Sequence, residues 1–206
     1  MRGLIERYVR EMVKIPSTSN TEMEKNCADY IAEELAKQPY FKEHPEQTGK
    51  YLLPEDSLGR SVPWGMVKGN GGSRKTIILT GHYDVVDTEE YGNERALAYD
   101  VEKWENLVKS GNVLPGMPDE VKEDFLSGDW MFGRGTADMK GGLSVGMALL
   151  DWYGKIVAEA EGKARSVAVS EAEVASELGD ASGISGNLLF VTVPDEEGYS
   201  AGMRGA

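Results

Sequence analysis

Cysteine, histidine and positively charged residues are all scarce in this chain, and this composition limits the compartments and binding partners that the sequence fits. Its 206 residues include one cysteine and two histidines, and 35 acidic side chains outweigh 22 basic ones to give a formal net charge of −13. Because Cys27 has no partner for an internal disulfide, the sequence predicts a reduced protein in the cytoplasm. The acidic balance predicts that neither nucleic acid nor an anionic membrane surface is a partner.

Long apolar runs are also lacking. No stretch approaches the roughly 20 residues that a membrane-spanning helix requires. Residues 1–7 (MRGLIER) lack the apolar centre of a signal peptide. The length is sufficient for one domain with a sizeable core, and no internal repeat is visible.

The periodicity of apolar residues predicts alternating helices and strands. Residues 4–13 have helical spacing and Pro16 ends that helix, while Thr21 and Glu24 fit a capping box that opens a second helix. Strands are predicted at 64–68, 76–80 and 188–193, with the first two joined as a hairpin through the Asn-Gly step of residues 69–72. Further helices are predicted at 137–152, within 157–182, and within the segment 87–129.

The first chemically informative motif is GHYDVV, residues 81–86, which directly follows an apolar strand. Residues two apart on an extended chain point the same way, so the Asp84 carboxylate approaches the His82 imidazole. A carboxylate in that position fixes the tautomer of a histidine and strengthens it as a metal ligand. Taken alone, the pair fits a strand-end histidine capped by an aspartate equally well.

Two further segments place acids beside glycine-rich turns or at strand ends. GRGTADMKGG, residues 133–142, sets Asp138 in a turn before a helix, where glycine lets the backbone bend around a bound ion. PDEEG, residues 194–198, follows the last predicted strand with three consecutive acids. Such closely packed like charges need a cation or solvent between them. By itself, the segment at residues 194–198 fits a solvated acidic turn better than a metal site.

Together the three segments supply imidazole nitrogen and carboxylate oxygen but no thiolate. This donor set suits a catalytic zinc or a similar divalent metal. The carboxyl ends of sheet strands are also where α/β proteins bind their ligands.

The three motifs, in this order after an amphipathic first helix, resemble those of the dinuclear zinc peptidase and deacylase family. That family contains acetylornithine deacetylase, succinyl-diaminopimelate desuccinylase, aminoacylase and glutamate carboxypeptidase. The long segment 87–129 between the first two motifs resembles the branch of arginine-utilisation proteins. The resemblance implies an α/β fold, a three-layer sandwich with a mixed central sheet of the zinc-exopeptidase type.

The resemblance also implies roles for five residues. His82 would bind one metal, Asp84 would orient the His82 imidazole, and Asp138 would bridge the two metals. Glu196 would be the general base and Glu197 a ligand of the other metal. The implied cofactor is zinc, with cobalt or manganese as alternatives. The implied reaction is hydrolysis of an amide bond in a small acylated amino acid or peptide.

Two further ligands and a dimerisation domain follow these motifs in family members. We therefore expect residues 1–206 to be the amino-terminal part of one metallohydrolase catalytic domain, incomplete at its carboxyl end, from a longer, homodimeric enzyme. The alternative is a truncated, inactive relative that acts in binding or assembly. His44 is expected at the surface, and Arg134 fits either a substrate carboxylate or a structural ion pair.

Overall fold

A four-stranded mixed sheet forms the centre of the protein, whose computed structural model describes residues 1–111, 116–167 and 185–205. Its strands are β1 (Thr48–Leu52), β2 (Ser61–Val67), β3 (Thr76–His82) and β4 (Asn187–Val193), arranged in the order β1-β2-β4-β3. β2 is antiparallel to both of its neighbours, β1 and β4, whereas β3 runs parallel to β4. The predicted α/β class with a mixed sheet is confirmed.

The predicted hairpin between β2 and β3 is wrong. β4 lies between these strands and pairs with both of them, although it comes more than a hundred residues later in the sequence. An Asn-Gly step is a local signal only, whereas the apolar run of β4 can be buried between two strands. The chain therefore turns at residues 69–72 without pairing its two flanking strands.

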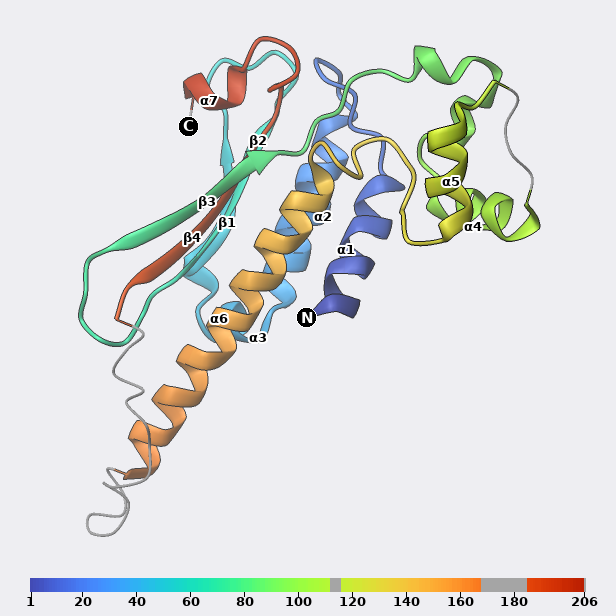
Figure 1. The fold of residues 1–206 in the computed structure, drawn as a ribbon. Helices are drawn as coiled ribbons and strands as arrows, with labels where there is room; N and C mark the ends of the chain where they lie inside the picture. Colours follow the sequence, from blue (N-terminus) through green and yellow to red (C-terminus); the bar gives the residue numbers. More distant parts are fainter. Residues whose placement is uncertain (112–115, 168–184, 206) are drawn as a thin grey trace.

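Helices α1 (Arg2–Val13), α2 (Glu24–Lys37) and α6 (Lys140–Val167) gather on one face of the sheet (Figure 1). Their apolar stripes and the inward residues of β2 and β4 make one core. Its buried members include Met12, Cys27, Ile31, Leu35, Leu143, Met147, Leu150 and Phe190. The first two helices and the start of the third confirm the periodicity in the sequence, and the short α3 (Pro39–Glu43) and η1 (Pro45–Gln47) close this layer.

The opposite face of the sheet carries an apolar surface. It is lined by Tyr51, Val62, Trp64, Met66, Leu189 and Val191. Only the short α7 (Ala201–Gly205) follows β4 within the described chain, and its Gly202 lies against Val193 and Pro194 at the end of that strand. The expected third layer is thus not among the described residues.

A smaller group of helices lies beside α1, away from the sheet (Figure 1). It consists of η2 (Glu89–Leu97), α4 (Val101–Ser110) and α5 (Asp119–Ser127), which bears out the helical pattern predicted within 87–129. Val101 packs on α1, and Lys14 donates to Glu102 at 2.6 Å. This group begins and ends next to the two motifs that bracket it in the sequence.

α6 continues well beyond the predicted end at residue 152 and reaches Val167. The rest of the stretch predicted as helix up to residue 182 lies outside the described residues. Among the helices that the structure describes, none combines the length and apolar character required to cross a membrane.

Candidate metal centre

His82 is the last residue of β3 and is 5% exposed. Its Nδ1 lies 3.0 Å from the backbone oxygen of Asp84 and 3.3 Å from the Asp84 carboxylate. Both are acceptors, so Nδ1 carries the proton and donates it. Nε2 is left facing the carboxylates of Asp138, at 3.1 Å, and Glu196, at 3.8 Å. With Nδ1 held as the donor, Nε2 is the nitrogen able to bind a metal once its own proton has left.

Asp84 is fully buried and joins two of the predicted motifs. Its carboxylate accepts hydrogen bonds from the Ser19 hydroxyl at 2.5 Å and from the backbone nitrogens of Glu196 and Glu197, both at 3.1 Å. Burial alone would raise the pKa of Asp84, but its hydrogen bonds with His82, Ser19 and the two amides outweigh burial and lower it. An ionised Asp84 thus fixes both His82 and the turn that follows β4.

The acidic turn reaches His82 because β3 and β4 are parallel and end at the same edge of the sheet. His82, Glu196 and Glu197 each offer a ligand atom, and these atoms lie within 4.8 Å of one another. The Glu196 side chain is 51% exposed, in contrast to Asp84 beneath it. One cation placed here would meet an imidazole nitrogen and two carboxylates.

Asp138 approaches the Nε2 atom of His82 from the loop that precedes α6. The loop turns at Gly133 and Gly135, which have φ values of 150° and 81° that side chains rarely allow. Lys140, buried at the start of α6, donates to the backbone oxygens of Met12 and Ile15 at 3.0 and 2.7 Å. A buried ammonium group thereby ties this loop to the end of α1.

The charges at this site fit a divalent cation. Burial and the negative charges of Asp138 and Glu196 raise the pKa of Glu197. Burial would lower the pKa of His82, but Asp84 and Asp138 outweigh burial and raise it to about 9. Without a metal, a proton on His82 relieves the repulsion between the acids. A divalent cation bound to the same nitrogen and oxygen donors would do so more fully.

All five predicted site residues therefore meet at one edge of the sheet. Their assigned roles, including the division between Glu196 as base and Glu197 as ligand, stay predictions. Sequence reasoning missed the residues beneath them, namely Glu24, Arg60, the buried Asp195 and Lys140. The signal for Glu24 was present but misread as a capping box. Its carboxylate accepts from the backbone nitrogen of Asn20 at 2.8 Å and from more distant groups, not from Thr21.

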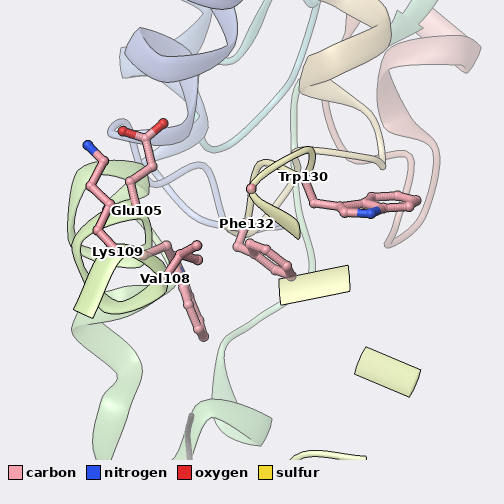
Figure 2. Close-up of a pocket in the computed structure, with 7 residues that line it drawn as sticks. Glu105, Val108, Lys109, Trp130 and Phe132 are labelled. Atoms are coloured by element: carbon pink, nitrogen blue, oxygen red, sulfur yellow. The ribbon is translucent and has the colours of Figure 1, made fainter. Parts of the chain in front are cut away.

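Two other features lie apart from this cluster. Arg134 forms an ion pair with Glu90, so the structural interpretation of Arg134 fits better than substrate binding. A cleft between α4 and residues 128–132 has Glu105, Val108 and Lys109 on one side and Trp130 and Phe132 on the other (Figure 2). No residue of the predicted site lines this cleft.

The chain is similar to two curated proteins of Bacillus subtilis (strain 168). It is 29% identical to Protein RocB over 199 residues, which are 97% of this chain and 30% of that protein. It is 34% identical to Uncharacterized protein YqjN over 193 residues, 93% of this chain and 29% of that protein. The chain thus spans less than a third of the length of these relatives.

No protein-family model matches the chain. Among solved structures, the M20 family metallo-carboxypeptidase Sso-CP2 from Sulfolobus solfataricus superposes with a TM-score of 0.48 and 18% sequence identity, covering 94% of this chain and 31% of that one. Through its three motifs and its similarity to Protein RocB, the chain resembles the dinuclear zinc peptidase and deacylase family, with its branch of arginine-utilisation proteins.

Proposed function

We propose that this chain carries the first ligands of a dinuclear zinc site that hydrolyses the amide bond of a small acylated amino acid or peptide, within a longer enzyme that forms a homodimer. The observation that carries the proposal is the pairing of His82 with acids on both ring nitrogens. Asp84 holds Nδ1, and Nε2 faces Asp138 and Glu196. Cobalt or manganese would satisfy the same donors.

The metal ions would polarise the scissile carbonyl and lower the pKa of a bound water molecule. His82, Asp138 and Glu197 would hold the ions, and Asp84 would keep the imidazole in its ligating tautomer. Glu196 is exposed enough to meet a water molecule, so it would take a proton at its carboxylate and pass it to the leaving amine. Two backbone amides of the turn that bears Glu196 donate hydrogen bonds to Asp84, and these bonds limit how far the base moves.

Metal binding by the purified chain tests this proposal. After equilibration with zinc and exhaustive dialysis, we expect roughly one or two zinc ions per chain. The His82→Ala variant should lose them, and His44→Ala, which changes the only other histidine, should keep them. Hydrolysis of acylated amino acids is the next assay. Equal zinc contents in the parent chain and His82→Ala would contradict the proposal.

A second candidate function is favoured by the apolar face of the sheet. Tyr51, Trp64 and Met66 lie on this face beside Leu189 and Val191, and surfaces of this kind mark interaction sites. An inactive relative that acts in binding or assembly would use this face and leave the acids idle. Two results would favour this second function. The parent chain would associate whether or not zinc is present, and it would hold no more zinc than the His82→Ala variant.

A further inference from the structure

A buried ion cluster lies directly beneath the acidic turn. Glu24, Arg60 and Asp195 are 0%, 4% and 1% exposed. The Arg60 guanidinium donates to Glu24 at 3.1 Å, lies 3.3 Å from the Asp195 carboxylate, and forms a two-pronged pair with Asp56 at 2.7 Å. The cluster joins α2, the loop before β2 and the turn after β4, which are far apart in the sequence.

Such a cluster is costly to bury, and stability alone is a weak explanation for it. Removing an arginine and several carboxylates from water costs several kcal/mol per ion, and hydrophobic replacements of buried ion pairs are often as stable. The first residue of α2 is a favourable place for the Glu24 carboxylate because the amino end of a helix is partly positive. The cluster does, however, hold its carboxylates in fixed orientations, and so it fixes the groups that donate hydrogen bonds to them.

Three consecutive backbone amides of the acidic turn donate to buried carboxylates. Asp195 donates to Glu24 at 2.9 Å, while Glu196 and Glu197 donate to Asp84, both at 3.1 Å. Asp195 has a φ of 60°, a conformation that non-glycine residues adopt only where their surroundings enforce it. Two buried carboxylates from separate elements thus receive every amide of the turn from Asp195 to Glu197.

We propose that Glu24 and Arg60 are positioning residues that hold the turn at residues 195–197 so that its two exposed carboxylates face His82. Asp84 fixes the second and third amides, and Glu24 fixes the first, just where the chain leaves β4. Arg60 sets the Glu24 carboxylate by donating to the oxygen that Asp195 does not use. The inference rests on the proposed function for its consequence in metal binding, but the position of the turn is measurable without a metal.

The test compares Glu24→Gln with Glu34→Gln at about pH 8, above the pKa of about 7 to which burial raises Glu24. Glu34 is a matched control because it lies on the same helix, is 7% exposed, and is paired with Arg7 and Lys37. Hydrogen exchange at the amides of residues 195–197 should be about tenfold faster in Glu24→Gln and unchanged in Glu34→Gln. The zinc dissociation constant should rise about tenfold in the first variant only.

Each outcome bears on the proposal separately from the proposed function. If both variants unfold at similarly lowered temperatures and neither changes exchange in the turn, the cluster is merely structural and the positioning role is wrong. If the parent chain binds no zinc but Glu24→Gln still loosens the turn, the proposed function fails for this chain and the positioning role stands. Should Glu24→Gln not fold, Arg60→Lys keeps the charge but loses the guanidinium that contacts Glu24 and Asp56 together, and it should loosen the same amides.

Discussion

Two groups of acids lie at the same edge of the sheet, and the comparison between them explains the site. Asp84 and Glu24 are completely buried and accept hydrogen bonds from backbone amides, a hydroxyl and a guanidinium. Asp138 and Glu196 have side chains 74% and 51% exposed and face His82. One residue chemistry thus serves two purposes. Carboxylates surrounded by donors hold the backbone, and carboxylates open to solvent keep lone pairs for a cation or a water molecule.

Removing a buried acid should break the comparison most severely. In Asp84→Ala the amides of Glu196 and Glu197 lose their acceptor and His82 loses its partner. We expect the free energy of unfolding to fall by about 3–5 kcal/mol. Urea denaturation measures this change, with Asp138→Ala as the control from the exposed group. Equal losses in the two variants would mean that the distinction between buried and exposed acids has no energetic basis.

Protonation of His82 gives the next largest effect, in the metal-free chain. The pKa of His82 is about 9 in the folded protein against an ordinary value of 6.5, so folding favours the protonated imidazole. The resulting stability is fully present below pH 6.5 and is lost as the pH rises through 9. Linkage predicts a loss of about 3 kcal/mol from this group.

Urea denaturation in the presence of a chelator, at about pH 6 and about pH 10, measures that loss. His82→Gln should remove this part of the pH dependence, because glutamine does not titrate. A variant with the same pH dependence as the parent chain would show that Asp84 and Asp138 do not stabilise the protonated imidazole as the distances indicate.

The smallest effect on stability is expected for Glu196→Gln. The side chain is exposed, and surface substitutions of this kind usually change the free energy of unfolding by less than about 0.5 kcal/mol. Under the proposed function the same variant should lose turnover in the longer enzyme while this chain keeps its zinc. Loss of zinc as well would reverse the roles of Glu196 and Glu197.

The sequence predicted the acids that belong to local motifs, including the buried Asp84, but it missed the role of Glu24, for a physical reason. His82, Asp138 and the Glu196–Glu197 pair stand at strand ends or in glycine-rich turns, which are local patterns. Glu24 and Arg60 have no such pattern, because their partners come from distant segments. Thr21 and Glu24 even suggested a capping box. The hydrogen bonds that Arg60 and the Asp195 amide donate to the Glu24 carboxylate are visible only in the fold.

The same division holds for the sheet. Apolar periodicity located β2, β3 and β4, as well as α1 and α2, because each pattern reflects burial of one segment. Strand order was not contained in these patterns, and the Asn-Gly turn favoured a hairpin that does not form. Pairing depends on which strands bury the most apolar surface together, which is a property of the whole chain.

By itself, the sequence determined the α/β class, the places where chemistry is possible, and the imidazole and carboxylate donors that suit a divalent metal. Only the tertiary structure decided that β4 inserts beside β3. That insertion brings Glu196 and Glu197 to His82, and it buries Asp84 and Glu24 beneath them as the acceptors of the turn. Local patterns depend on neighbouring residues, whereas the position of a carboxylate relative to an imidazole depends on every element packed between them.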